Sequence, residues 1–244
     1  MRLTRIHVDL PLAAGARIAL PDAAAGHLLR VLRAQVGDPC VLFNGDGNDY
    51  DARIAAIGRR EASVEVLGVR AVDNESPLQI TLMQGIARGD KMDWILQKAT
   101  ELGVAAVLPV SSERSEVRLD RARADKRVAH WRSVVVSACE QSGRAQLPQL
   151  TPLQSLVAAL PLLPQTALRL LLDPQAAMSL ATLPEPETGI VIAVGPEGGW
   201  SPRDREALHA AGFNGVRLGP RVLRTETAGI AAIAILQLRF GDLA

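Results

Sequence analysis

The stretch "GIVIAVGPEGGWSPRDREALHAAG" (residues 189–212) contains a strand, a glycine-rich loop and a helix in that order. Its first six residues are almost all apolar, which is typical of a strand buried on both faces of a parallel sheet. Ser201 as N-cap, Pro202 at the first helical position and Gly212 at the end predict the helix. This order indicates an α/β fold, with the loop at the carboxyl edge of the sheet, where open α/β folds bind ligands.

The same alternation continues on both sides of this stretch. We expect further strands and helices at residues 78–84 (strand), 91–102 (helix), 105–110 (strand), 120–143 (helix), 168–173 (strand), 215–219 (strand) and 225–240 (helix). The last helix is apolar almost all round, so it is expected to be buried, either within its domain or between two subunits. Of these alternatives we favour the interface of a homodimer.

The N-terminal part of the chain has a different pattern. Up to about residue 70 it reads as short strands, with a tight-turn sequence "NGDGND" at 44–49 and one helical segment at 23–35. This pattern predicts a small β-barrel with one helix. The polar stretch "AVDNESP" (residues 71–77) is the best linker candidate. We therefore expect two domains, 1–72 and 73–244.

The composition of the 244 residues, 48% hydrophobic with a net charge of +1, is that of an ordinary globular protein. The chain has no apolar run long enough to span a membrane and no signal-peptide pattern at its N-terminus, so we expect a cytoplasmic protein without a membrane partner. Cys40 and Cys139 stand far apart and are expected to be buried free thiols. The four histidines lack the spacing of metal ligands, so no metal is expected.

Charge alone does not identify the partner. The near-neutral balance gives no sign of nucleic-acid binding, although all but three of the 27 basic residues are arginines. Arginine suits phosphate contacts and base stacking, but a genome-wide preference for arginine codons explains the excess equally well.

Two glycine-proline loops follow apolar strands, "GPEGGW" at 195–200 and "LGPRVLRTETAG" at 218–229, and a third strand ends at Asp173. A phosphate ligand fits them poorly. They lack the lysine and Ser/Thr of a P-loop, and Glu197 would repel an anion. A neutral or cationic molecule gripped by the backbone fits better, since glycine permits close approach of the main chain. Adenosine attached to a positively charged sulfonium has this character.

Five motifs follow one another over nearly the whole chain: "HLLRVLRAQVGD" (27–38), "QKATELGV" (97–104) with "PVSSERSE" (109–116), "SACEQSGRAQLPQL" (137–150), "VGPEGGWSPRDREAL" (194–208) and "VRLGPRVLRTETAGIAAIAILQ" (216–237). Through these motifs the chain resembles the SPOUT class of S-adenosylmethionine-dependent RNA methyltransferases. Within that class it resembles the family that methylates uridine N3 in 16S ribosomal RNA, at uridine 1498. The resemblance implies a PUA-like RNA-binding β-barrel, a C-terminal α/β domain with a deep trefoil knot, a homodimer and the small ribosomal subunit as partner.

The resemblance also implies site residues. Those expected at the cofactor, S-adenosylmethionine, are Leu171, Leu172, Gly195, Pro196, Glu197, Gly198, Gly199, Leu218, Gly219, Pro220, Val222, Leu223 and Arg224. For catalysis, Arg224 is expected to stabilise the charge that develops on the uracil, and Glu226 to orient the base or take its N3 proton. The candidates for RNA contact are Arg5, His27, Arg30, Arg33, Arg114 and Arg144.

Structural explanations exist for several of these residues. Thr225 and Glu226 also fit the N-cap and the first-turn acid of the last helix, and Glu197 also fits a residue that satisfies loop amides. Two other function classes remain: a non-catalytic RNA-binding protein on the same fold, and an enzyme that binds a nucleotide such as ATP. A methyltransferase of the same class acting on another RNA is a further alternative.

Overall fold

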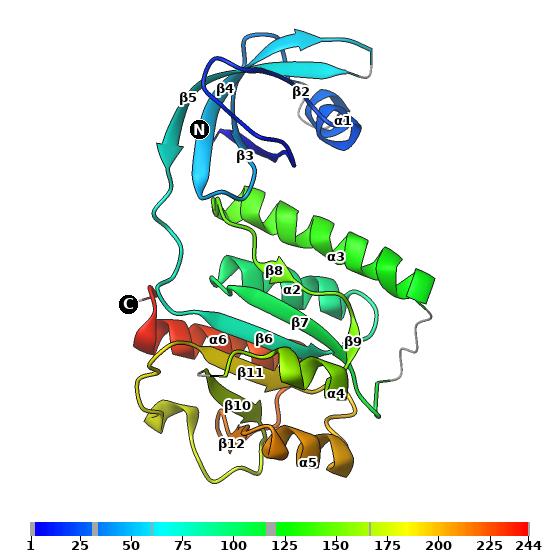
Figure 1. Cartoon of the computed structure of the whole chain (residues 1–244), viewed down its shortest axis with the longest axis vertical. Helices are drawn as coiled ribbons and strands as arrows, with labels where there is room; N and C mark the ends of the chain where they lie inside the picture. The colour runs from blue at the N-terminus through cyan, green and yellow to red at the C-terminus, as the bar shows by residue number, and fades with distance from the viewer. Residues whose placement is uncertain (1–2, 31–33, 60, 116–120, 166, 244) are drawn as a thin grey trace. The chain divides into compact units, whose positions relative to one another are not determined.

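The computed structural model describes residues 3–30, 34–59, 61–115, 121–165 and 167–243, without the side chains of residues 23, 27, 29, 30 and 121. The chain divides into two compact units (Figure 1). Unit 1 comprises residues 1–75 and 139–147, and unit 2 comprises residues 76–138 and 148–244.

Unit 1 is built on one mixed five-stranded sheet with the order β1-β3-β4-β5-β2. Its elements are β1 (Thr4–His7), β2 (Arg17–Ala19), α1 (Asp22–Arg30), β3 (Pro39–Phe43), β4 (Asn48–Ile57) and β5 (Ala62–Ala71). Strands β1 and β3 are parallel, and the other pairs are antiparallel. The predicted turn joins β3 to β4, where Gly45 and Gly47 adopt φ of 94° and 90°, a region that favours glycine.

The segment 139–147 joins unit 1 through buried ion pairs, which the linear domain division did not anticipate. Arg144, 5% exposed, pairs with Glu75, and its carbonyl oxygen accepts a hydrogen bond of 3.0 Å from Nη2 of Arg5. Arg5 pairs with the buried Asp49 and lies 4.7 Å from the centroid of the Phe43 ring. Because these partners are far apart in sequence, no local pattern marks the segment as part of unit 1.

Both cysteines belong to unit 1 and are buried free thiols, as predicted. Burial raises the pKa of Cys40 to about 11 and that of Cys139 to about 12. Both thiols are therefore protonated at neutral pH.

Unit 2 is built on one sheet in which every strand pair is parallel, with the order β12-β10-β11-β6-β7-β8 and β9 beside β7. The strands are β6 (Ile80–Gly85), β7 (Ala106–Ser111), β8 (Gln149–Leu150), β9 (Gln154–Ser155), β10 (Leu168–Leu172), β11 (Ile190–Val194) and β12 (Asn214–Val216). Strand β12 begins and ends earlier than the predicted 215–219. Leu218 and Gly219 consequently belong to the loop that follows it.

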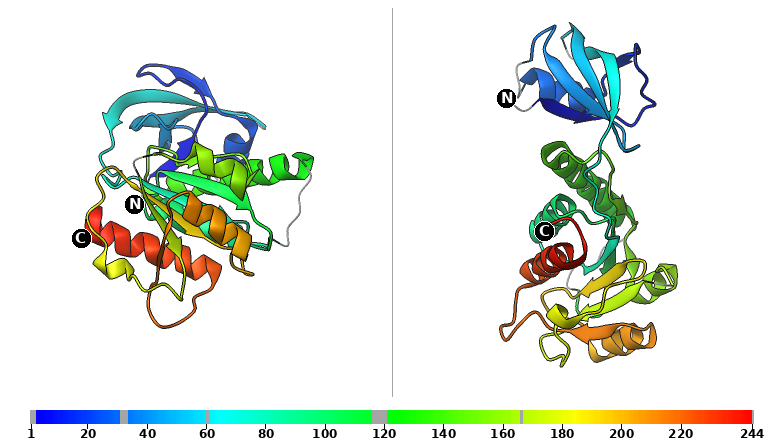
Figure 2. Two further views of the ribbon diagram at one scale, coloured as in Figure 1. Left: turned by 60° about the horizontal axis from the view of Figure 1, so that its bottom comes forward. Right: turned by 90° about the vertical axis from the view of Figure 1, so that its left-hand side faces the viewer.

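Helices cover both faces of this sheet (Figure 2). They are α2 (Lys91–Glu101), α3 (Arg121–Ser142), α4 (Leu156–Ala159), α5 (Pro202–Ala210) and α6 (Thr225–Phe240), with the short 3₁₀ helices η1 (Leu160–Leu162) and η2 (Leu180–Thr182). Successive residues of β11 point to opposite faces. Ile190 and Ile192 pack in the core with residues of α2, α3 and α6, whereas Val191 and Ala193 pack with residues of α4 and α5. This is the predicted α/β arrangement. None of the described helices is long and apolar enough to cross a membrane.

Helix α6 is buried along one face only. The residues on that face are Thr225, Gly229, Ala232, Ile233, Leu236 and Gln237. Apolar side chains on the remaining surface are half-buried, and Leu238 is 58% exposed. The packing of unit 2 therefore accounts for part of the apolar character of this helix. It leaves an apolar strip only partly covered, made of Ile230, Ala231, Ala234, Ile235 and Leu238.

Candidate functional site

A cavity of about 470 Å³ lies at the carboxyl ends of β10, β11 and β12 in unit 2. It is lined by Leu172, Asp173 and Pro174 at the end of β10, by residues from the end of β11 and the loop 195–200, and by residues from the end of β12 and the loop 218–224. Helices α2, α5 and α6 add Lys91, Arg205, Thr225 and Ala228. Its volume is in the range of small-molecule sites, and three parallel strand ends converge on it.

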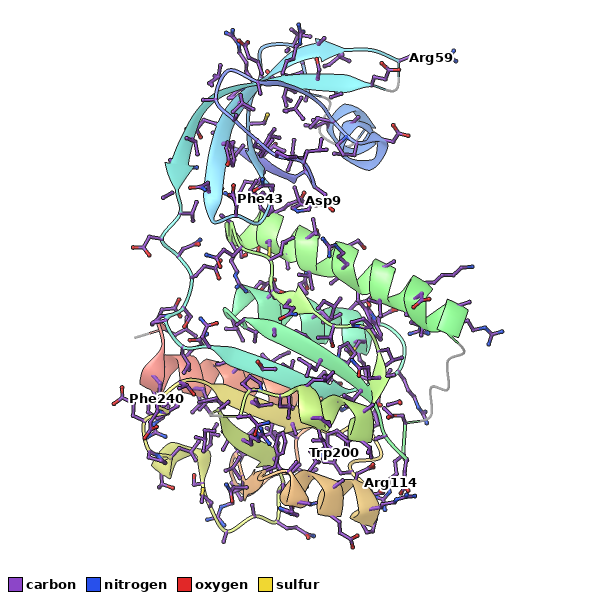
Figure 3. The ribbon with its side chains drawn as sticks, in the orientation of Figure 1. Asp9, Phe43, Arg59, Arg114, Trp200 and Phe240 are labelled. Atoms are coloured by element: carbon purple, nitrogen blue, oxygen red, sulfur yellow. The ribbon has the colours of Figure 1, made fainter. Side chains whose placement is uncertain are left out.

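The loop 195–200 is held in a tight conformation against the end of β6. The Gly199 amide donates to the Pro196 carbonyl at 2.8 Å, and Gly199 adopts φ of 65°. Trp200, 3% exposed, closes the loop, and its indole N–H has no hydrogen-bond partner among the described residues. A buried donor on a lining residue suits a ligand that supplies an acceptor. Figure 3 labels Trp200 and also Arg114, whose guanidinium donates to the Gly198 carbonyl at 3.1 Å.

The charged residues of the cavity fall into two groups. Lys91 pairs with Glu197 at 3.0 Å, and Arg205 pairs with Asp173. Arg221 and Arg224, both exposed, form no ion pair or side-chain hydrogen bond within the described part of the chain. The cavity thus presents two arginines that are available to an incoming anionic or hydrogen-bonding group.

Two carboxylates lie near Lys91 and differ in their surroundings. Burial alone would raise the pKa of Glu197, but hydrogen bonds from its own amide, from the Arg88 amide and from Lys91 outweigh burial and lower the pKa below its usual value. Glu226, in the first turn of α6, is not among the residues that line the cavity, and its Oε2 lies 3.8 Å from the Lys91 ammonium. This oxygen is buried and has no hydrogen-bond partner among the described residues. Hydrogen bonds therefore hold Glu197, whereas Glu226 meets Lys91 at ion-pair distance without a hydrogen bond.

Most residues predicted at the cofactor line the cavity. They are Leu172, Gly195, Pro196, Glu197, Gly199, Leu218, Gly219, Val222, Leu223 and Arg224. Three predicted residues are not in the lining. Leu171 is fully buried in the core with residues of α4 and α5, and its side chain does not face the cavity. Gly198 lies against Arg114, and Pro220 is exposed.

Several lining residues are not among the predicted ones: Lys91, Pro174, Val194, Trp200, Arg205, Val216, Arg221, Thr225 and Ala228. Lys91 and Arg205 have no signal in the sequence, because each enters the cavity from a helix. Arg221 does have a signal, because it is a charged residue between two predicted contacts of the second loop. Thr225 is predicted as an N-cap, but the N-cap of α6 is Arg224, and the Thr225 hydroxyl donates to the Gly195 carbonyl at 2.6 Å.

The predicted RNA contacts divide into three groups. Arg5 and Arg144 are buried in ion pairs within unit 1, which corrects their assignment as surface contacts. His27 and Arg30 belong to α1, but their side chains lie outside the described part of the structure, as does the whole of Arg33. Arg114 is exposed beside the loop 195–200. Among the described residues, no group of three or more His, Cys, Asp or Glu side chains is placed to hold a metal ion.

The close contact between β6 and the loop 195–200 should make the protein sensitive to any side chain added at Gly85. A Cβ added at Gly85 would lie 2.5 Å from Cδ and 2.7 Å from N of Pro196, so backbone atoms must move. We expect Gly85→Ala to reduce the free energy of unfolding by about 1–3 kcal/mol. Urea unfolding followed by tryptophan fluorescence measures this, since all three tryptophans belong to unit 2.

The matched control is Gly229→Ala, within α6 of the same unit. Its added Cβ would meet only ordinary contacts at 3.5 Å or more, and alanine is a better helix former than glycine, so this variant should be as stable as the parent or more stable. Equal stability of the Gly85→Ala and parent proteins would show that the loop adjusts freely.

Known proteins show the same architecture. A family model described as RNA methyltransferase domain matches residues 74–237, and one described as RNA methyltransferase PUA domain matches residues 20–67. A protein from Buchnera aphidicola (of Schizaphis graminum), named ribosomal RNA small subunit methyltransferase E, is 32% identical, with 99% of this chain and 98% of the relative covered. The chain belongs to the ribosomal RNA small subunit methyltransferase E family.

Solved structures agree with this family assignment. A methyltransferase E from Neisseria gonorrhoeae, bound to S-adenosylmethionine, is 43% identical with a TM-score of 0.95, and both chains are fully covered. A putative methyltransferase from Legionella pneumophila, in complex with the same cofactor, is 36% identical with a TM-score of 0.94, again with both chains fully covered. Unit 1 is accordingly the PUA-like part and unit 2 the SPOUT methyltransferase part of a methyltransferase E fold.

Proposed function

We propose that this protein uses S-adenosylmethionine to methylate 16S ribosomal RNA of the small subunit, and that the methylated atom is N3 of uridine 1498. The observation that carries the proposal is the cavity between two glycine-proline loops, with Arg224 in its lining and Glu226 close behind it in the first turn of α6. Family membership supports the cofactor and the RNA class. The atom and the position within the RNA rest on the resemblance of the sequence motifs.

The described residues fit this cofactor. Backbone groups of the loops 195–200 and 218–224 would hold the adenosine, and Leu172, Leu218 and Leu223 offer apolar contacts to its ring. The unpaired indole N–H of Trp200 can donate to a polar atom of the ligand. When bound, the cofactor supplies a methyl group on a positively charged sulfonium, and Glu197 gives the cavity a carboxylate compatible with that charge.

The residues around the cavity can then promote the reaction at the uracil. Uridine N3 carries a proton and is a poor nucleophile until that proton leaves. Of the two nearby carboxylates we assign the role of base to Glu226, because hydrogen bonds from the Arg88 amide and from Lys91 already occupy Glu197. As negative charge spreads onto O2 and O4 of the uracil, the Arg224 guanidinium stabilises it. The rigid loops align the two reactants, which contributes through proximity.

Exposed arginines support binding of the RNA. Arg114 beside the first loop and Arg221 on the second can reach phosphates next to the target nucleotide, and α1 of the PUA-like unit carries the candidates His27 and Arg30. We also propose that two copies of the chain form a homodimer through the partly covered apolar strip of α6. We further propose that unit 2 contains the deep trefoil knot that the resemblance implies. The proposed place of action is the cytoplasm, where small subunits are found.

The proposal is tested by transfer of labelled methyl groups from S-adenosylmethionine. Small subunits, large subunits and transfer RNA, all from cells that lack this protein, are the candidate substrates. We expect label only in small-subunit RNA, recovered as 3-methyluridine after digestion to nucleosides. Label in another RNA or at another atom would overturn the substrate, and binding of the cofactor without any transfer would favour a non-catalytic RNA-binding protein.

A further inference from the structure

Gln84 is a polar residue in the core of unit 2 that no part of the proposed reaction uses. It is the last residue but one of β6, and its side chain is completely buried. It does not line the cavity. Burying an amide is costly unless hydrogen bonds replace those made with water, so the partners of Gln84 indicate its purpose.

The Gln84 amide begins a directed chain of hydrogen bonds. Its Nε2 donates to the Gly85 carbonyl at 2.8 Å and to the Thr225 hydroxyl at 3.0 Å. The amide nitrogen can only donate, so the hydroxyl accepts from it and gives its single proton to the Gly195 carbonyl at 2.6 Å. Exchanging Nε2 and Oε1 would place two oxygens against each other at Gly85, which fixes the orientation of the amide.

This chain joins three segments that are far apart in sequence. Gly85 ends β6, Gly195 begins the loop after β11, and Thr225 is the first residue of α6. Gly195 and Thr225 both line the cavity. The Gly195 carbonyl belongs to the peptide bond with Pro196, which restricts the Gly195 backbone, and the hydrogen bond from Thr225 holds this carbonyl toward α6. Gln84 thereby acts on the cavity through Thr225.

The carbonyl oxygen of the Gln84 amide gives a second argument for a role beyond structure. Oε1 of Gln84 is buried and has no hydrogen-bond partner among the described residues. An unpaired buried acceptor reduces stability, which offsets part of what the hydrogen bond to the Gly85 carbonyl contributes. The donor aimed at the Thr225 hydroxyl is the feature of glutamine that reaches the cavity.

We propose that Gln84 is a positioning residue for cofactor binding, which fixes the Thr225 hydroxyl as donor to Gly195 and so sets the spacing of the two cavity loops. This inference rests on the proposed function, because the ligand in question is S-adenosylmethionine. It adds a buried residue outside the cavity to the binding machinery.

The test is a double-mutant cycle on cofactor affinity, measured by titration calorimetry with S-adenosylmethionine and no RNA. Gln84→Met removes the donor at similar volume, and Thr225→Val removes the hydroxyl at the same shape. Each single variant should bind the cofactor about 5-fold more weakly, which is the range of one hydrogen bond. The double variant should also bind about 5-fold more weakly rather than 25-fold, because both changes break one chain.

Gln237→Met is the matched control. Gln237 is also completely buried in unit 2, and its amide donates to the Leu102 carbonyl at 2.8 Å and accepts from Ser76 at 2.6 Å, away from the cavity. This variant should unfold at lower urea concentration while its cofactor affinity stays that of the parent. Thr225→Ser, which restores a hydroxyl, should recover most of the affinity lost in Thr225→Val.

The outcomes separate this inference from the proposed function. If the parent protein does not bind S-adenosylmethionine, the proposed function fails first. If the parent binds and Gln84→Met binds equally well, or if the two changes multiply, the positioning role is wrong. Should Gln84→Met not fold, Thr225→Val and Thr225→Ser still decide whether the bond to Gly195 controls affinity.

Discussion

Replacing Arg224 by alanine should lower the turnover number by about 10²–10³-fold and change the dissociation constant of S-adenosylmethionine by less than about 3-fold. The guanidinium lies on the cavity wall at the start of α6, and within the described residues no carboxylate or carbonyl occupies it. Such a group is free to meet the charge that appears on the uracil oxygens only as the N3 proton leaves. An interaction made mainly in the transition state affects turnover rather than cofactor binding.

Steady-state kinetics with small subunits, together with calorimetry of the cofactor alone, measure both effects. Arg217→Ala is the matched control, because Arg217 is an exposed arginine just after β12 that does not line the cavity and donates to the Ala176 carbonyl. It should retain turnover. Arg224→Lys, which keeps the charge but loses the planar fork, should lie between the parent and the alanine variant. Full turnover in Arg224→Ala would remove Arg224 from the mechanism.

Replacing Glu226 by glutamine should lower turnover by about 10²–10⁴-fold near neutral pH, the range for loss of a general base. The change keeps the size of the side chain, which is mostly buried, and Oε2 of Glu226 lies 3.8 Å from the Lys91 ammonium without a hydrogen-bond partner in the described structure. The defect should narrow as the pH of the assay rises, since more of the uridine has already lost its N3 proton in solution. A residue that only supports the start of α6 would not produce that pH dependence.

The variant Glu197→Gln distinguishes the role of Glu197 from that of Glu226. Glu197 lines the cavity and binds Lys91 and the Arg88 amide, and its lowered pKa makes it the weaker base. We expect this variant to bind the cofactor more weakly, with a smaller effect on turnover than Glu226→Gln. The assignment would be reversed by two results together: a larger loss of turnover in Glu197→Gln than in Glu226→Gln, and no recovery of turnover at high pH in Glu226→Gln. Glu197 would then be the base.

Local patterns in the sequence predicted the longer strands and helices of unit 2 within a few residues, but not the short elements β8, β9 and α4. Ser201 and Asp204 form the capping box that starts α5, and both are within three residues of each other in the chain. The apolar run before Gly195 became β11, buried on both faces. These outcomes follow because capping, helix periodicity and strand burial depend on neighbours that the sequence itself places side by side.

The same local reasoning failed where one residue had to be placed against a distant one. Arg5 looked like a surface arginine, but Asp49 and the Arg144 carbonyl bind it inside unit 1. Lys91 looked like the first residue of an ordinary helix, yet it enters the cavity beside Glu197. Neither pairing can be predicted from the spacing of residues along the chain, because the partners are far apart in sequence.

Local patterns along the chain specify the α/β class of the C-terminal part and the two glycine-proline loops, and the motifs indicate the family. Contacts between distant residues place segment 139–147 in unit 1, bring Lys91 and Arg205 to the cavity, and connect Gln84 to Gly195 through Thr225. For the cavity and for Gln84, the cause is the strand order β12-β10-β11-β6. It brings the ends of strands that are distant in sequence to one edge, and the packing of the whole sheet, rather than any local pattern, sets that order.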